Sequence, residues 1–321
     1  MKKFNEIFID KTKYGEKIQT SEYEKQGKHI IVDQGQAEIA GYTNREEGLF
    51  NEVPVIIFGD HTRLIKYIDE PFFLGADGVK VLRSKEKNAN YKYLYYALKS
   101  AKIPNTGYNR HFKWLKDVEI NYPDSVKQEK IVDILDRVSD VIEKRKAELS
   151  YLDTLIKARF VEMFGDPIRN TQNRPTTEFI NVVKMQRGFD LPVQDRQQDG
   201  EIPVYGSNGA LDYHNVAKIH GGVITGRSGT IGKVFYTEGD FWPLNTSLFS
   251  ADTHGNNVIY LGYLLQLFDL TRFVEGTGVP TLNRNMFHNK QIIDVPIDEQ
   301  RQFAAFVNEI DKSKLQKFSA A

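Results

Sequence analysis

The chain has 321 residues, of which 43 are basic and 43 are acidic, with a hydrophobic content of 40% and no cysteine. The length allows two domains of ordinary size, and the hydrophobic content is enough for real cores, which excludes a disordered chain. The lack of cysteine excludes disulfides, Cys-based zinc sites and a Cys nucleophile, and the zero net charge argues against a histone-like nucleic-acid binder.

Residues 1–125 have the pattern of a mixed α/β domain. Short apolar runs separated by glycine and aspartate predict strands at residues 29–32, 53–58, 79–82 and 118–122. The segment Tyr91–Lys102 predicts a helix with its alanines and leucines facing inward. Pro123, followed by Asp124 or Ser125 as an N-cap, marks the start of the next helix.

A heptad pattern occupies residues 126–163 and contains neither proline nor glycine. Eight of its ten a and d positions are apolar through roughly five heptads, which predicts a coiled-coil seam on a helix about 57 Å long. A single seam cannot bury itself, so the helix needs a second helix as a partner; the alternative is a long helix lying on a globular core. The seam residues are Ile131, Leu135, Val138, Ile142, Leu149, Leu152 and Ile156.

The order of elements then repeats, after a break at Gly165-Asp166-Pro167. Tyr260–Leu265 matches Tyr93–Leu98, and residues 292–296 match 118–123, at an offset of roughly 170 residues, too long for a solenoid repeat. We therefore predict a duplicated domain at 164–296 and a second helix at 297–321. The second helix is shorter, so we expect it to pack antiparallel on the first and to leave part of the first without an in-chain partner.

Two stretches lack acidic residues, Ala97–Lys116 and Tyr213–Thr237, and both contain lysine and arginine. Local basic faces on a neutral chain suit a protein that contacts phosphate in two places, although such runs are more often solvated loops.

Several motifs resemble those of one family, the specificity subunit of Type I restriction-modification systems. The most specific pieces are Gly276–Asn283 followed by Val295–Gln300, and Ile224–Val234 and Trp242–Ser247 are also similar. The resemblance covers essentially the whole chain. It is looser in the first copy, where Gly107–Phe112 replaces the Thr-Gly-Val-Pro-Thr-Leu-Asn run, and the final helix is short for the family.

The resemblance implies an α+β fold with two homologous target recognition domains, separated by long helices that pack as an antiparallel coiled coil. Each domain would read one half of a split double-stranded DNA target, and the helices would act as a ruler between the halves. Two modification subunits would dock on the chain and methylate adenine N6 with S-adenosylmethionine. Restriction subunits would add ATP- and Mg²⁺-dependent activities, and no catalysis or cofactor is expected in this chain.

Half-sites one DNA turn apart, roughly 34–36 Å, lie on the same face of the duplex, which a helix of this length could span. Asn, Gln, Arg, Ser and Thr read base edges, whereas Lys and Arg hold phosphates, so polar loops of both domains supply the DNA-binding candidates. In the first domain these are Gln34, Gln36, His61, Thr62, Arg63, Asn105, Tyr108, Asn109, Arg110 and Lys113. In the second they are Ser207, Asn208, Thr225, Arg227, Ser228, Thr277, Thr281, Asn283 and Arg284.

The sequence leaves two other function classes open, a coiled-coil scaffold that binds only protein and, with less support, a DNA-acting enzyme. The run Gly226–Val234 is not a phosphate loop, because five residues separate the first glycine from Gly232-Lys233 and valine follows the lysine. Nuclease and methyltransferase motifs are absent, and the seven histidines lack metal-ligand spacing. The sequence has no apolar run of membrane-spanning length and no signal-peptide core, so we expect a soluble cytoplasmic protein.

Overall fold

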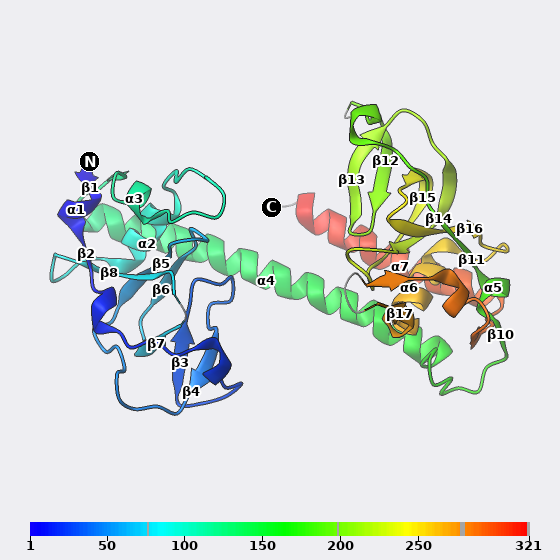
Figure 1. Ribbon diagram of the computed structural model, residues 1–321, viewed down its shortest axis with the longest axis horizontal. Helices are drawn as coiled ribbons and strands as arrows, with labels where there is room; N and C mark the ends of the chain where they lie inside the picture. Colours follow the sequence, from blue (N-terminus) through cyan, green and yellow to red (C-terminus); the bar gives the residue numbers. More distant parts are fainter. Residues whose placement is uncertain (76, 198, 277–279, 320–321) are drawn as a thin grey trace. The chain divides into compact units, whose positions relative to one another are not determined.

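The computed structural model describes residues 1–75, 77–197, 199–276 and 280–319, together with the side chains of all of these except 316–319. It divides into two compact units, Met1–Lys144 and Arg145–Ala321, called unit 1 and unit 2 below (Figure 1). Helices and sheets occur in both units, so the α+β prediction is confirmed. Among the described residues, no helix combines the length and the apolarity needed to cross a membrane.

Unit 1 contains a four-stranded sheet in the order β2-β8-β5-β6, a three-stranded sheet in the order β4-β3-β7, and the pair β1-β9. The strands are β1 Lys2–Lys3, β2 Phe8–Asp10, β3 His29–Val32, β4 Gly41–Thr43, β5 Val55–Gly59, β6 Ile65–Ile68, β7 Phe72–Leu74, β8 Val79–Ser84 and β9 Glu119–Ile120. Strand β5 is buried along its whole length, which explains why its sequence is a continuous apolar run and not an alternating one.

Helix α2 (Tyr91–Lys99) covers the four-stranded sheet of unit 1, and the short helices α1 (Phe4–Ile7) and α3 (Phe112–Leu115) pack in the same core. The side chain of Asn90 caps α2 by accepting a hydrogen bond from the Tyr93 backbone N–H at 2.9 Å. Leu94 and Leu98 are fully buried, as the sequence pattern predicted, and the helix ends three residues before the predicted Lys102.

Unit 2 contains a six-stranded sheet in the order β11-β16-β14-β15-β12-β13, and the pairs β10-β19 and β17-β18. The strands are β10 Thr176–Glu178, β11 Lys184–Arg187, β12 Ile202–Gly206, β13 Gly209–His214, β14 Ile219–Gly226, β15 Val234–Pro243, β16 Ser247–Asp252, β17 Val274–Glu275, β18 Thr281–Leu282 and β19 Gln291–Ile293. The helices besides the two long ones are α5 (Phe179–Val182) and α6 (Val258–Phe268). Helix α6 is buried almost all round, because the sheet covers one side and aromatic side chains of the long helices cover the other.

The first long helix, α4, runs from Ser125 to Phe164, and the second, α7, from Ile297 to Ser319. Asp124 caps α4, with its carboxylate accepting from the Lys127 backbone N–H at 2.9 Å. Gly165, at φ +79°, ends α4 in the left-handed conformation that glycine adopts without strain.

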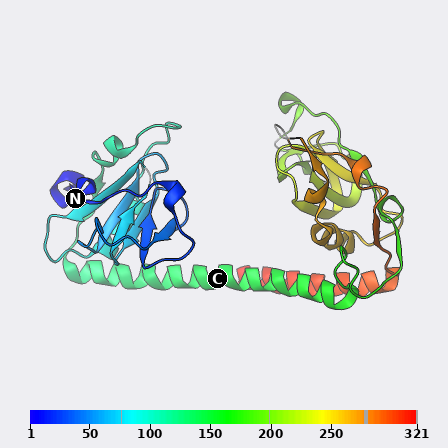
Figure 2. The ribbon, with the colours of Figure 1, turned by 60° about the horizontal axis from the view of Figure 1, so that its bottom comes forward.

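Helix α7 packs antiparallel on the C-terminal part of α4, which confirms the predicted helix pairing (Figure 2). The rings of Phe160 and Phe303 lie 5.4 Å apart, and Lys314 Nζ, near the other end of α7, lies 2.8 Å from Asp153 Oδ1. The start of α7 therefore contacts the end of α4, and residues further along α7 contact earlier residues of α4, as in an antiparallel pair.

The seam residues of α4 differ in burial. Ile156 is fully buried, whereas Ile131, Leu135, Leu149 and Leu152 are half-buried. Val138 and Ile142 are 49% and 48% exposed, so they lie in the part of α4 that the shorter second helix was expected to leave without an in-chain partner. The reason is the reach of α7, whose ion pair at Asp153 lies C-terminal to both.

Candidate nucleic-acid interface

Three polar loops of unit 1 meet at Gln34. Its side-chain Oε1 accepts from the His61 backbone N–H at 3.1 Å, and its Nε2 donates to the Asp77 carbonyl at 2.9 Å. The Thr62 hydroxyl donates to the Gln34 carbonyl at 2.7 Å. Gln34 was predicted as a base-reading residue, but its amide is already used in holding these loops together, so the structure gives it a positioning role.

Gly78 is required for this arrangement. Its φ of +93° is a conformation that side chains rarely adopt, and a Cβ there would lie 2.5 Å from Gln34 Nε2. Any larger residue would push the Gln34 side chain out of its bridge between the loops.

A buried lysine, absent from the sequence-based candidates, fixes the loop that bears Gln36. Lys66 is 7% exposed, and its Nζ donates to the Ala37 carbonyl at 2.5 Å and lies 3.7 Å from Asp33 Oδ1. Burial lowers the pKa of Lys66, and the Asp33 carboxylate opposes that shift. Gln36 itself is exposed on the loop.

The loop 104–111 is anchored through Asp60, which the sequence pattern also missed. The Asp60 carboxylate accepts from the Phe112 backbone N–H at 2.7 Å, and the Asp60 carbonyl lies 3.0 Å from Nδ1 of the fully buried His111. Because Asp60 directly follows β5, the rigid sheet holds the loop at its base. His111 is therefore structural.

The tip of this loop is an exposed aromatic and basic surface. The Tyr108 ring is 88% exposed and stacks on the His61 ring, with centroids 4.7 Å apart and planes 9° from parallel. Arg110 and Lys113 are exposed beside it in the chain and make no ion pair among the described residues. The candidates Asn105, Thr62 and Asn109 are exposed as well, whereas Arg63 is partly buried and donates to the Ile103 carbonyl at 3.4 Å.

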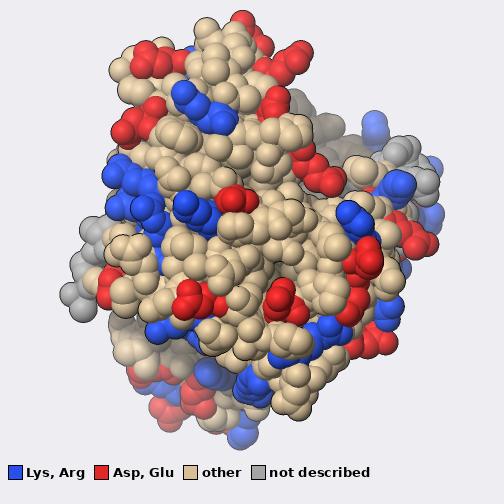
Figure 3. All heavy atoms as spheres, turned by 90° about the vertical axis from the view of Figure 1, so that its right-hand side faces the viewer, with Lys and Arg blue, Asp and Glu red and all other residues tan. Residues whose placement is uncertain are grey.

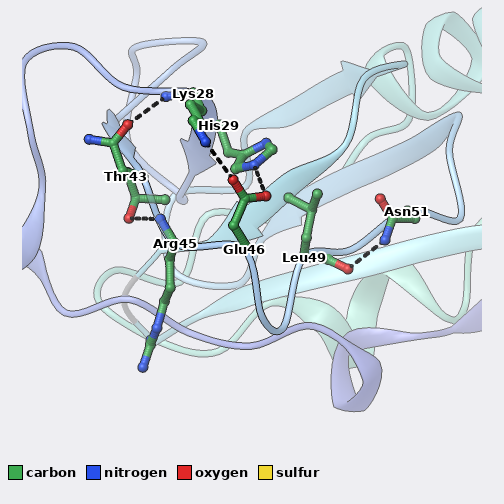
Figure 4. Close-up of polar contacts among 8 residues, drawn as sticks. Lys28, His29, Thr43, Arg45, Glu46, Leu49 and Asn51 are labelled. Atoms are coloured by element: carbon green, nitrogen blue, oxygen red, sulfur yellow. Dashed lines mark hydrogen bonds and ion pairs between the residues drawn. The ribbon is translucent and has the colours of Figure 1, made fainter.

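The cations on the β3–β4 hairpin of unit 1 are in a different situation. Figure 4 shows Glu46 accepting from Lys28 Nζ at 2.8 Å and lying 3.2 Å from His29 Nε2. Arg45 Nη1 lies 3.3 Å from Glu16 Oε1. Lys28 and Arg45 are thus paired with carboxylates of the same unit, whereas Lys113 Nζ lies 4.1 Å from the centroid of the Trp114 ring. Lys17 and, to a smaller extent, Arg110 lower the pKa of the Asp77 carboxyl.

In unit 2, three further loops converge at the end of β14. The Leu282 backbone N–H donates to the Arg227 carbonyl at 2.8 Å, and Ser228 forms an isolated β-bridge with Thr281. Lys233 Nζ donates to Asn208 Oδ1 at 2.8 Å, which ties the β12–β13 turn to the glycine-rich loop. The glycine-rich run is thus a connection between strands, and its lysine is engaged by a neighbouring loop.

A basic cavity of about 260 Å³ lies where these loops meet β11. Three arginines, Arg187, Arg227 and Arg284, line it together with Asn283 and Asn285. Guanidinium and amide groups in one concave site are donors suited to phosphate oxygens or to guanine and adenine edges. Arg187 and Asn285 were not among the predicted residues; Arg187 lies at the end of a strand whose partner, β16, is not evident from local pattern.

Two predicted residues of unit 2 need separate mention. Thr225 is fully buried in β14 and its hydroxyl donates to the Lys233 carbonyl at 2.8 Å, so the prediction that its side chain reads DNA is corrected to a structural role. Thr277 lies outside the described residues. Ser207 is half-buried and Asn208 exposed at the β12–β13 turn.

His288 supports the segment that carries Arg284. Its Nε2 accepts from the Met185 backbone N–H at 3.2 Å, which requires an unprotonated nitrogen. Burial lowers the pKa of His288, and the nearby Arg284 and Lys184 cations act in the same direction.

Acidic and basic side chains are interspersed over the face of the molecule shown in Figure 3, where unit 2 faces the viewer. The described residues contain no cluster of three or more His, Asp or Glu side chains able to hold a metal ion. The cavity of unit 2 therefore offers hydrogen-bond donors from arginine and asparagine side chains, on a surface where acidic and basic residues are mixed.

Comparisons with known proteins agree on one family. Residues 1–151 and 170–318 match the model of the Type I restriction modification DNA specificity domain. The chain is 29% identical over 133 residues to the specificity subunit of the Escherichia coli Type I restriction enzyme EcoR124I/EcoR124II, a match that spans 37% of this chain and 33% of that relative.

Solved structures show the same fold. The S subunit of a Type I restriction-modification system from M. genitalium superposes with a TM-score of 0.61 at 17% identity, over 99% of this chain and 91% of that one. A chain from a structure of complex assembly in the type I R-M system aligns with a TM-score of 0.50 at 14% identity, over 98% of this chain and 86% of that one.

Proposed function

This chain belongs to the family of Type I restriction-modification DNA specificity subunits, and we propose that each of its two units reads one half of a split double-stranded DNA target. The chain would be the non-catalytic reader of a larger complex. Methylation with S-adenosylmethionine and ATP- and Mg²⁺-dependent restriction would belong to partner subunits.

The observation that best supports the proposal is the cavity lined by Arg187, Arg227 and Arg284. A bidentate arginine contact with guanine contributes roughly 1–3 kcal/mol of discrimination, and asparagine pairs in the same way with adenine. Asn283 and Asn285 share this cavity, so one small site offers both kinds of donor.

Unit 1 offers a different chemistry, which suits a second, unlike half-site. Its exposed Tyr108–His61 stack carries an apolar face, and Arg110 and Lys113 lie beside it in the chain as phosphate donors. Helix α4 runs unbroken from Ser125 to Phe164 through the boundary of the units, as a spacer between two readers would need to do.

We propose that two modification subunits, and the restriction subunits, dock on the middle of α4. Ile134, Val138, Val141 and Ile142 are each 48% to 60% exposed there. Such a cluster of exposed aliphatic side chains on one helix is typical of a protein interaction surface.

DNA binding at graded salt concentrations separates this proposal from a protein-binding scaffold. The complex with modification subunits should bind duplex DNA with an affinity that falls linearly on a log–log plot against salt, because phosphate contacts release counterions. A scaffold without DNA readout would show no affinity above that of the modification subunits alone, and that result would reject the proposal.

A further inference from the structure

The apolar side chains that join α4 to the rest of unit 1 are half-buried. Ile131 and Val132 pack against the core that contains α2, and Leu135 follows one turn further along the helix. In unit 2, by contrast, Phe160 and Phe164 of the same helix are fully buried. Because apolar attraction has no direction, three half-buried side chains do not by themselves fix how α4 is rotated against the rest of unit 1.

Two donors of α2 meet a single carboxylate of α4. Lys92 Nζ donates to Asp136 Oδ2 at 2.6 Å, and the Tyr96 hydroxyl donates to Asp136 Oδ1 at 2.7 Å. Lys92 and Tyr96 lie four residues apart, on one face of α2, so each oxygen of the carboxylate has its own donor. The Tyr96 hydroxyl also lies 3.3 Å from Ser139 Oγ of α4. Hydrogen bonds are directional, so this contact can fix the rotation that the apolar side chains leave open.

The three groups are in the charge states that this contact needs. Burial raises the pKa of the Asp136 carboxyl, but the hydrogen bonds from Lys92 and Tyr96 outweigh burial and lower it. The hydrogen bond to Asp136 raises the pKa of Lys92, and burial raises the pKa of Tyr96. At neutral pH an ionised acceptor therefore faces a charged donor and a protonated hydroxyl, and hydrogen bonds to an ionised group are roughly twice as strong as neutral ones.

We propose that Asp136 is a positioning residue, which fixes the rotation and register of α4 against the rest of unit 1 and thereby narrows the range of gaps that the complex accepts between half-sites. This role rests on the proposed function, in which α4 sets the gap. One base pair changes the gap by about 3.4 Å and turns the duplex by about 35°. A shift of that size between α2 and α4 would break both bonds to Asp136, because a hydrogen bond does not extend beyond about 3.5 Å.

Methylation of DNA targets with altered gaps tests this role in the complex with modification subunits. Asp136→Ala removes both bonds, and Tyr96→Phe removes one of them without any change on α4. The wild type should methylate poorly when the gap is lengthened or shortened by one base pair. Asp136→Ala should reduce this discrimination about tenfold and Tyr96→Phe about threefold, because methylation at the altered gaps rises. A general loss of activity would instead lower methylation at every gap alike.

Each variant has a matched control on the same helix. Asp133→Ala removes an exposed carboxylate of α4, whose Oδ2 lies 2.8 Å from Arg137 Nη2 of that helix. Tyr95→Phe removes a hydroxyl of α2 that accepts from Lys99 Nζ at 2.9 Å. Both controls should keep the discrimination of the wild type. Unchanged discrimination in Asp136→Ala, an equal change in the controls, or an equal loss at every gap would overturn the proposal.

Spin labels test the same contact without DNA. The chain has no cysteine, so Lys25→Cys in the loop before β3 and Lys144→Cys on α4 give one labelled pair at two exposed positions. The distribution of distances between the labels should broaden in Asp136→Ala and keep its width in Asp133→Ala; equal widths would overturn the proposal.

The two experiments separate the role of Asp136 from DNA recognition. If the wild type prefers one gap and Asp136→Ala does not change that preference, the proposal fails and the proposed function stands. If the wild type prefers no gap while the label distances broaden in Asp136→Ala, the proposed function fails and the contact through Asp136 stands.

Discussion

At the scale of single residues, the polar candidates separate into those that hold loops and those that remain available. Gln34 and Thr225 use their side chains within the fold, whereas Arg110 is exposed and Arg284 lines a cavity. In the sequence, both groups are polar residues of the same types, so residue type alone does not separate them. The tertiary hydrogen bonds that distinguish them become visible only when the strands pair.

Arg284→Ala should reduce modification of the intact DNA target about 10- to 100-fold, because a base or phosphate contact is worth roughly 1–3 kcal/mol. Arg110→Ala should act on the other half-site. The readout is the methylation rate on targets mutated in either half. Lys28→Ala is the control, because that lysine is paired with Glu46. An equal loss of methylation in the control would mean that Arg284 and Arg110 have no specific role in DNA recognition.

The half-buried His288 should make the free energy of unfolding depend on pH. Its folded pKa lies below the unfolded value of about 6.5, so the unfolded state binds the proton first. The contribution of neutral His288 to the free energy of unfolding is present above about pH 6.5 and is lost as the pH falls below that value. Urea unfolding between pH 8 and pH 5.5 should show a smaller decline for His288→Gln than for the wild type; parallel curves would contradict this.

At the scale of elements, α4 performs different tasks along its length. Its C-terminal turns belong to a packed aromatic core, and its middle exposes Val138 and Ile142. The heptad pattern predicted one continuous seam, because periodicity reports an apolar stripe and not the length of the partner that covers it.

Phe160→Ala should lower the free energy of unfolding of unit 2 by about 3–5 kcal/mol, the usual cost of removing a buried aromatic ring. Phe160 is fully buried among three other rings. Tyr151 lies on the same helix and is 75% exposed. Tyr151→Ala should therefore change the free energy of unfolding by less than about 0.5 kcal/mol. Denaturant unfolding checks both, and similar losses would contradict the packing described.

Deleting residues 143–149, which leaves the proposed docking residues of α4 in place, should shorten the gap in the recognised DNA sequence. Seven residues remove about 10.5 Å of helix and turn it by only about 20°, so the relative orientation of the flanking segments is nearly kept. The expected change is about three base pairs, at roughly 34 Å per ten. Asp140→Ala with Lys144→Ala changes exposed polar residues of the same helix, keeps the helix length and should keep the gap; an unchanged gap after the deletion would mean that α4 does not set it.

At the scale of the whole molecule, the duplication carried the most information in the sequence. It predicted two α+β units and an antiparallel helix pair from matched segments such as Tyr93–Leu98 and Tyr260–Leu265, because repeated apolar patterns survive when individual loops change. The supports of the candidate sites were not predictable in this way. Lys66 and Asp60 act through partners distant in the chain, and Arg187 reaches the cavity through the pairing of β11 with β16. No local pattern shows those pairings.

The central claim is that two unlike readers in one chain recognise one split target, and mapping methylated adenines tests it most directly. DNA exposed to this chain with modification subunits and S-adenosylmethionine is sequenced for N6-methyladenine. Methylation is expected within a motif of two short, unlike half-sites separated by a fixed number of unspecified base pairs. A single contiguous motif, or methylation without sequence preference, would contradict it.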